Sequence, residues 1–157
     1  MRVVSNTTPI ISLAAIGHLN LLEKLFGNIV IAEAVYKEIK AKPSYGHQQI
    51  DAPFIQVQTI QGCLYKDFLL SQLDSGETET IILAKEISAD FVLIDENLGY
   101  KVATTAGLSA IRTLSILLKA KEKGYIDRIK PLLDDMIAKG RWYSSAVYRS
   151  CLDRAGE

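Results

Sequence analysis

The sequence is poor in several features that would each assign a class of protein. Among its 157 residues only two are cysteines, Cys63 and Cys151, and neither stands in a CxxC or zinc-type spacing. We therefore expect reduced, mostly packing thiols and a reducing compartment. No apolar run approaches the roughly 18 residues of a membrane span. Met1-Arg2 leads directly into a strand pattern with no visible signal peptide, so we expect a cytoplasmic protein that does not enter a membrane.

Motifs of phosphate-binding and nucleophilic enzymes are also missing. The sequence has no GxGxxG or GxxxxGK[ST] loop, which argues against a dinucleotide enzyme or an NTPase. Ser5 is not in a GxSxG elbow, and His18 and His47 accompany no plausible nucleophile, so we interpret both as surface or packing residues. The 18 acidic and 18 basic residues cancel. Nucleic acid would therefore have to bind through a local basic patch, bound cations or a partner subunit.

The composition is that of an ordinary globular domain, with 48% hydrophobic and 23% charged residues. A chain of this length buries a sizeable core without disulfides or a structural metal. Because the sequence shows no repeats, low-complexity segments or linkers, we expect residues 1–157 to form a single domain.

Strand and helix patterns alternate along the chain. Short apolar runs predict strands at residues 2–5, 28–32, 55–60, 91–95 and 108–111. Apolar residues at helical spacing predict helices at residues 8–27, 33–42, 74–88, 96–107, 114–124, 127–140 and 144–156. Pro131 requires the helix at 127–140 to start late or bend. The alternation predicts an α/β fold with a central parallel sheet flanked by helices on both faces.

Acids and amides gather where ligands bind in such sheets, beyond the carboxyl ends of the strands. The candidates at these strand ends and on the adjacent helices are Ser5, Asn6, Glu38, Glu77, Glu79, Asp95, Glu96 and Asn97. Carboxylates crowded in one cleft repel one another unless protons or cations intervene. Oxygen ligands without sulfur or imidazole select Mg²⁺ or Mn²⁺, which can activate water and stabilise charge on a phosphodiester.

The residues at the strand ends also have purely structural interpretations. Asn6 suits an N-cap or a turn, and Glu38 suits a solvated helix face. Asp95 is the hardest to explain in this way, because a carboxylate straight after a buried strand is costly unless it is liganded or hydrogen-bonded.

The two acids of the helix at 74–88 compete for one role. Glu77 stands three residues after Asp74, the spacing of a capping box. Glu79 lies about 200° further round the helix, so the two cannot easily reach one ion. The spacing leaves open which of them faces the site.

Four blocks of the sequence resemble the PIN-domain proteins: "VVSNTTPIISLAAIGHLNLLEKLFGNIVIAEAVYKEI", "LDSGETETIILAKE", "FVLIDENLGYKVATTAGL" and "LLKAKEKGYI". They are most similar to the subgroup of PIN-like, predicted nucleic-acid-binding proteins related to the VapC toxins. The resemblance runs from Val3 to the terminal "RAGE". It implies an α/β fold whose acidic cluster binds Mg²⁺ or Mn²⁺ and hydrolyses RNA phosphodiesters.

The resemblance also implies residue roles. The catalytic and metal-binding positions fall on Asn6, Glu38, Glu77 and Asp95, with Glu79 as the register alternative to Glu77, Glu96 beside Asp95, and Ser5 and Thr7 as flanking residues that can bind phosphate or a metal-bound water. PIN nucleases usually have Asp where this chain has Asn6. An amide oxygen coordinates a hard cation but contributes no charge, so we expect weaker metal binding and reduced or absent activity.

The leading hypothesis is a Mg²⁺- or Mn²⁺-dependent endoribonuclease, the toxin of a toxin–antitoxin pair. The resemblance implies an RNA substrate, a small antitoxin protein that blocks the cleft, and a homodimer. The alternative is a PIN-like nucleic-acid- or protein-binding module whose catalysis is weakened or lost, and Asn6 motivates it. A receiver-type phosphoacceptor at Asp95 ranks lower, because no lysine evidently follows a later strand.

Overall fold

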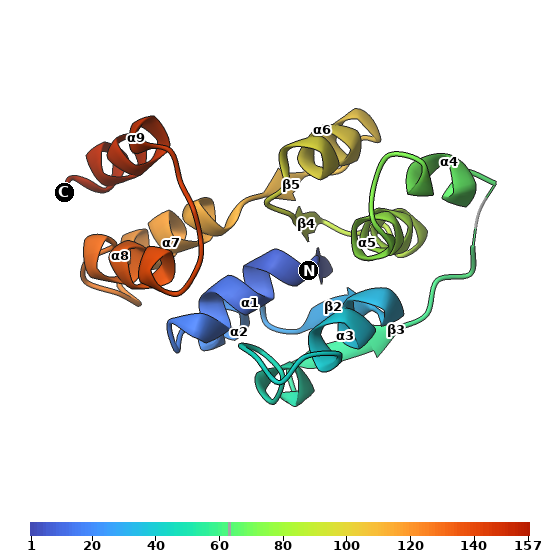
Figure 1. Ribbon diagram of the computed structural model, residues 1–157, viewed down its shortest axis with the longest axis horizontal. Coiled ribbons are helices and arrows are strands. Elements are labelled where there is room, and N and C mark those ends of the chain that lie inside the picture. The colour runs from blue at the N-terminus through green and yellow to red at the C-terminus, as the bar shows by residue number, and fades with distance from the viewer. Residues whose placement is uncertain (63) are drawn as a thin grey trace.

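A parallel sheet forms the centre of the molecule. The computed structural model describes residues 1–62 and 64–157. Its five strands pair in parallel, in the order β3-β2-β1-β4-β5 (Figure 1). The strands are β1 (Val3–Ser5), β2 (Ile29–Ala32), β3 (Ile55–Gln58), β4 (Phe91–Leu93) and β5 (Ala110–Ile111).

Helices cover both faces of this sheet. They are α1 (Thr7–Ala15), α2 (Asn20–Phe26), α3 (Glu33–Lys40), the 3-10 helix η1 (Gln49–Asp51), α4 (Lys66–Leu70), α5 (Ser75–Glu86), α6 (Asn97–Thr105), α7 (Thr113–Glu122), α8 (Lys130–Ala138) and α9 (Ser145–Ala155). In Figure 1, α1, α2, α7, α8 and α9 lie on one side of the strands and α4, α5 and α6 on the other. The predicted α/β architecture is confirmed.

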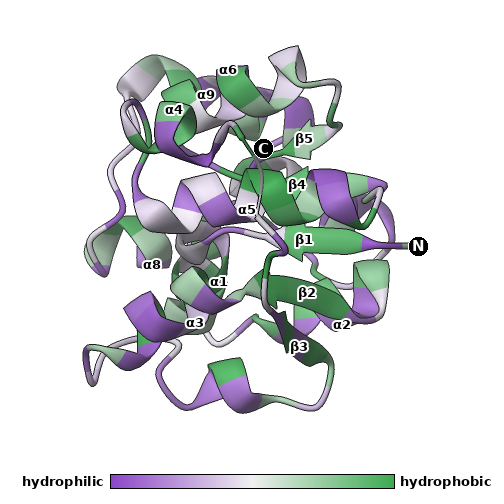
Figure 2. Cartoon of the chain, turned by 90° about the vertical axis from the view of Figure 1, so that its right-hand side faces the viewer, coloured by the Kyte–Doolittle hydropathy of each residue, from purple (hydrophilic) through white to green (hydrophobic). Residues whose placement is uncertain are grey.

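Successive strand residues fill two separate cores. Val3 packs in a cluster with side chains of α1, α2, α7 and α8, whereas Val4 packs in a cluster with side chains of α5 and α6. This follows from the alternation of side chains along a strand. Because both faces are covered, β1, β2 and β4 carry almost only apolar residues, which colours them green in Figure 2. In these three strands the one polar side chain, Ser5, therefore lies at a strand end, whereas the edge strand β3 also carries Gln56 within it.

Several sequence-based boundaries are confirmed. Asp74 and Glu77 form the capping box that starts α5, and Gly27 ends α2 with a φ of +75°. The helix with Pro131 starts late, at Lys130, with the proline in its first turn. Cys151 is a buried free thiol, whereas Cys63 lies outside the described residues.

The single helix predicted for residues 8–27 is wrong, because the chain turns within it. Gly17 adopts a φ of +70°, and the N–H groups of Gly17 and His18 donate to the carbonyl oxygens of Ala14 and Leu13. This is the way in which a glycine commonly ends a helix. Within the described residues, no single helix has the length and apolar content to cross a membrane; α1 and α2 meet those criteria only together, and a bend of 119° separates them.

Candidate metal centre

The carboxyl ends of β1 and β4 lie side by side and bring two polar segments together. Ser5 pairs with Leu93 in the parallel register, and the backbone N–H of Asn6 donates to the carbonyl oxygen of Leu93 at 2.9 Å. The backbone of Asn6 therefore lies beside the segment that follows β4, which contains Asp95 and Glu96. This is the sheet edge at which the sequence predicts a site.

Asn6 occupies the N-cap position of α1 but does not cap the helix with its side chain. The amide Nδ2 instead donates to Glu96 Oε2 at 3.2 Å. The amide Oδ1 is buried and has no hydrogen-bond partner among the described residues, and the residue as a whole is only 2% exposed. A buried acceptor left unpaired costs about 1–3 kcal/mol. The Oδ1 atom is therefore a candidate ligand atom.

Two carboxylates stand near this oxygen, around Gly76 in the first turn of α5. A methyl group at Gly76 would lie 3.4 Å from Asn6 Oδ1, 3.5 Å from Asp74 Oδ1 and 3.5 Å from Glu38 Oε2. Thr7 donates a hydrogen bond to the same oxygen of Glu38. One amide oxygen and two carboxylates thus approach a point that the lack of a side chain at Gly76 keeps open.

Glu77 is buried next to Asp74. The Asp74 Oδ1 accepts the N–H of Glu77 at 2.8 Å, and Glu77 Oε1 accepts the N–H of Asp74 at 3.5 Å. Burial and, after it, the charge of Asp74 raise the pKa of Glu77 to about 7, and the charge of Glu96 adds to the rise. Glu77 therefore completes the capping box of α5 and also lies close to the carboxylates of Asp74 and Glu96.

Glu79 makes a different contact. The N–H of Ala34, in the first turn of α3, donates to Glu79 Oε1 at 3.2 Å, so this carboxylate stabilises the start of that helix. Glu79 lines a shallow hollow of about 440 Å³ together with Glu38. Of the two register alternatives, Glu77 is the one whose carboxylate senses Asp74 and Glu96.

The carboxylate of Asp95 is engaged with protein groups on both oxygens. Its Oδ1 accepts the backbone N–H of Thr113 at 2.7 Å, and its Oδ2 accepts the Thr113 hydroxyl at 2.7 Å and Arg141 Nη2 at 3.0 Å. Its side chain is 4% exposed. The expectation that a carboxylate here must be liganded or hydrogen-bonded is thus met by the start of α7 and by the segment before α9.

Glu96 lies between two adjacent hollows. Its Oε1 accepts a hydrogen bond from Thr8, and its Oε2 accepts the one from Asn6. Together with Asn6 and Glu38 it lines a hollow of about 390 Å³. Together with Asp95 it lines a second hollow, of about 540 Å³. Glu38 and Asp95 therefore lie in neighbouring hollows rather than in one.

The two flanking hydroxyls are used within the protein. Ser5 is completely buried, and its hydroxyl donates to the carbonyl oxygen of Asn6 at 2.9 Å. Thr7 donates to Glu38. Their roles toward phosphate or water stay predictions.

The donor set around Gly76 suits a hard cation, since it consists of oxygen atoms alone. Among the described residues, no group of three or more His, Cys, Asp or Glu could by itself hold a metal ion. The set at Gly76 has two carboxylates, Glu38 and Asp74, and its third oxygen is the amide of Asn6. The sequence reasoning missed Asp74 because capping alone explains an Asp at the start of a helix.

The sequence profile of the PIN-domain family DUF3368 matches residues 2–157. The chain belongs to the PIN-domain family. PIN domains are typically nucleases that use divalent metal ions, which supports the interpretation of the oxygen-rich sheet edge. No curated protein matches the sequence. A solved structure with some similarity is a domain of a functionally unknown protein from Methanocaldococcus jannaschii DSM 2661, with 17% identity, a TM-score of 0.46, and coverage of 71% of this chain and 89% of that one.

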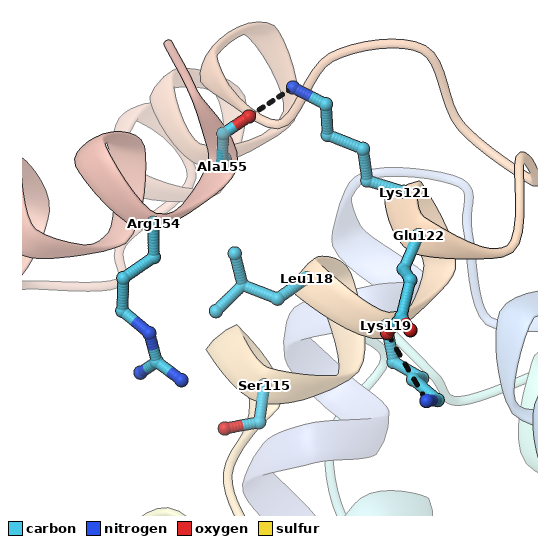
Figure 3. A pocket seen from close by; sticks show the side chains of 7 residues that line it. All are labelled: Ser115, Leu118, Lys119, Lys121, Glu122, Arg154 and Ala155. Carbon is cyan, nitrogen blue, oxygen red and sulfur yellow. Dashed lines mark hydrogen bonds and ion pairs between the residues drawn. The ribbon is translucent and has the colours of Figure 1, made fainter.

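A further hollow of this PIN domain, of about 560 Å³, lies between α7 and α9 and differs in chemistry from the acidic edge. Figure 3 shows Lys121 donating to the carbonyl oxygen of Ala155 and Lys119 pairing with Glu122. Its lysines are thus engaged in contacts between or within the two helices. The contact of Lys121 fastens α9 to α7, and neither contact assigns a chemistry to the hollow.

Proposed function

We propose that this PIN domain is a Mg²⁺- or Mn²⁺-dependent endoribonuclease whose metal ion is held by Asn6, Glu38 and Asp74, with Glu77 beside them. One observation carries the proposal. The buried Oδ1 of Asn6 has no hydrogen-bond partner among the described residues and stands with two carboxylate oxygens around the bare Cα of Gly76.

The charge of the cluster supports the same proposal. Carboxylates that gather at one edge repel one another, and a divalent cation relieves that repulsion. Burial and, after it, the charge of the neighbouring carboxylates raise the pKa of Glu77. Glu38 and Asp74 are exposed, so an ion and a phosphodiester can reach the cluster from solvent.

The chain's own residues orient this centre. A bound Mg²⁺ or Mn²⁺ supplies positive charge that stabilises a phosphodiester in the transition state and lowers the pKa of water. Thr7 holds the carboxylate of Glu38, and Glu96 holds the Nδ2 of Asn6 so that the amide has a fixed orientation. Asp95, which the resemblance makes a fourth catalytic and metal-binding position, fixes the start of α7 and Arg141 next to Glu96.

Asn6 favours a second candidate function, a PIN-like module that binds nucleic acid or protein with little or no cleavage. Its amide lowers the negative charge of the cluster by one unit relative to an aspartate, which weakens the hold on a cation. The substitution Asn6→Asp restores that charge and separates the two candidates.

The test is cleavage of a labelled RNA that contains paired and unpaired regions, with Mn²⁺ or Mg²⁺ and with EDTA. We expect metal-dependent cleavage by the wild type, loss of cleavage in Glu38→Gln, and retention in Glu79→Gln, a control on the neighbouring carboxylate. Cleavage only by Asn6→Asp would support the binding module. Equal cleavage by the wild type and Glu38→Gln would refute the nuclease assignment.

The biological role in the proposal is that of a toxin restrained by a small antitoxin protein, with a homodimer as the working form. It derives from the VapC-like resemblance. Coexpression with a short reading frame that adjoins this gene tests it. Relief of a growth defect by that frame, together with co-purification of its product, is the expected result. The lack of both would contradict the toxin role without touching the nuclease proposal.

A further inference from the structure

Trp142, the one tryptophan in the sequence, projects from a segment that is fastened on both sides. It is 78% exposed and lies between α8 and α9. Before it, Arg141 pairs with the buried Asp95 at 3.0 Å. After it, Ser144 Oγ accepts the N–H of Val147 at 3.1 Å and caps α9. A large aromatic on a held backbone binds a partner with little loss of conformational entropy.

Tyr143 fastens the same segment further. Its hydroxyl accepts a hydrogen bond from Arg141 Nε at 3.2 Å and donates one to Met136 Sδ at 3.6 Å. The Arg141 guanidinium stands over the Tyr143 ring, 4.8 Å from its centroid. Both neighbours of Trp142 are therefore packed inward, which leaves the indole as the outward member of the segment.

Arg112 presents a fixed positive charge to the same region. Its guanidinium stacks on the ring of Tyr100, 4.2 Å from the centroid. Its Nη1 donates to the carbonyl oxygen of Asp95 at 2.7 Å and to Asn97 Oδ1 at 3.0 Å. Among the described residues it pairs with no carboxylate, and its other N–H groups make no hydrogen bond. An oriented guanidinium of this kind suits a phosphate.

Arg112 and Trp142 line one hollow, of about 540 Å³, together with Asp95 and Glu96. The charge of Asp95 is neutralised there by Arg141. Glu96 also lines the hollow that contains Asn6 and Glu38. A chain lying in the Trp142 hollow would therefore pass directly to the proposed metal centre.

We propose that Trp142 and Arg112 form a nucleotide subsite, in which the indole stacks on an unpaired base and Arg112 binds a phosphate, so that the protein selects single-stranded RNA. This inference rests on the proposed nuclease function, because it explains how a strand is held beside the acids. A stacking platform requires an exposed base face, and a base within a duplex has none. The neutral net charge of the chain makes such local contacts necessary.

The subsite is tested by the fluorescence of Trp142, which reports on this position alone because the chain has no other tryptophan. A short single-stranded RNA is titrated in EDTA, where metal-dependent cleavage cannot occur, and the duplex of the same sequence is titrated in parallel. We expect saturable quenching by the single strand and at least roughly tenfold weaker binding of the duplex.

Binding of a labelled single strand is then compared between variants by fluorescence anisotropy. Trp142→Ala is expected to weaken binding roughly 10-fold to 100-fold and Trp142→Phe much less, since stacking on a ring persists. Arg112→Gln is expected to weaken binding and reduce its salt dependence. Tyr65→Ala is the control, because Tyr65 is also exposed but precedes α4, on the side of the sheet opposite α8 and α9 (Figure 1).

Each outcome separates this inference from the nuclease proposal. Unaltered binding by Trp142→Ala, equal binding of the duplex, or the same loss in Tyr65→Ala would overturn the subsite, even if the wild type cleaves RNA. Trp142→Ala should keep the Mn²⁺ affinity of the wild type. Quenching by single strands in a protein that binds no Mn²⁺ would uphold the subsite and refute the metal centre.

Discussion

Replacing Glu77 with glutamine should make the metal-free protein more stable at neutral and alkaline pH. Burial and the charge of Asp74 raise the pKa of Glu77 from its ordinary value of 4.5 to about 7. A group whose pKa is raised on folding stabilises the protein below its unfolded pKa, and that stabilisation is lost as the pH rises through the folded pKa. The wild type should therefore lose stability between about pH 5 and pH 8 relative to Glu77→Gln.

The size of this effect follows from the same values. If the pKa of Glu77 rises from 4.5 to about 7 on folding, ionisation of this residue lowers the free energy of unfolding at pH 8 by about 3 kcal/mol. Glu77 is 8% exposed, so solvent screens little of it, but its acidic neighbours titrate as well. We therefore expect the advantage of Glu77→Gln at pH 8 to be about 2–3 kcal/mol, or roughly 5–10 °C in Tm.

The assay is urea unfolding of both proteins in EDTA across this pH range, repeated with Mn²⁺. The glutamine keeps the size of the side chain and an acceptor for the N–H of Asp74, so the helix start is preserved. Added Mn²⁺ should stabilise the wild type more than the variant. A constant difference between the two proteins from pH 5 to pH 8 would refute the account of Glu77.

Three further substitutions test the metal centre and two of the contacts that stabilise the fold. Gly76→Ala places a methyl group at ordinary contact distance from Asn6, Glu38 and Asp74. We expect the Tm to stay equal or rise and the Mn²⁺ affinity measured by calorimetry to fall roughly 10-fold or more. Unchanged affinity would contradict the convergence of the three oxygen atoms at Gly76. Asp95→Ala should destabilise the fold to urea by about 3–5 kcal/mol, because it leaves Arg141 without its buried partner, and a loss below 1 kcal/mol would show that the pair matters little. Burial opposes ionisation of Glu157, but hydrogen bonds from the N–H groups of Ile129 and Lys130 outweigh it and lower its pKa to about 2. Above about pH 4.5, Glu157→Gln should therefore lower the free energy of unfolding by about 1–2 kcal/mol, and the difference from the wild type should disappear as the pH falls toward 2. The control Glu122→Gln, at an exposed carboxylate, should show no such difference. Parallel pH profiles of the wild type and Glu157→Gln would contradict this.

The sequence predicts the architecture because strands buried on both faces are continuous apolar runs, and the helices between them carry apolar residues at helical spacing. Val3 and Val4 belong to two different cores, and an uninterrupted apolar strand is the consequence of burial on both sides. The same logic predicts that Asn6 and Asp95 lie at one sheet edge. The turn at Gly17 was not predicted, because a glycine inside an apolar run is compatible with either a continuous helix or a turn until its φ is known.

The site was less predictable, because the partner of each acid comes from a distant part of the chain. Asp95 finds Arg141 across 46 positions, and no local pattern links the two. Helical spacing alone separates Glu77 from Glu79 in direction but does not say which of them faces the sheet edge. Glu77 is buried beside Asp74, whereas Glu79 accepts the N–H of Ala34 in α3. These directions depend on how the two helices pack.

The most direct test of the account is calorimetric titration of Mn²⁺ into the wild type, Glu38→Gln and Glu79→Gln. The two glutamates lie on neighbouring helices and line one hollow, but it is Glu38 whose carboxylate is among the three atoms nearest to the open point at Gly76. We expect saturable binding by the wild type and by Glu79→Gln, and its loss in Glu38→Gln. Absence of binding in the wild type, or equal binding in all of the proteins, would contradict a metal centre at this sheet edge.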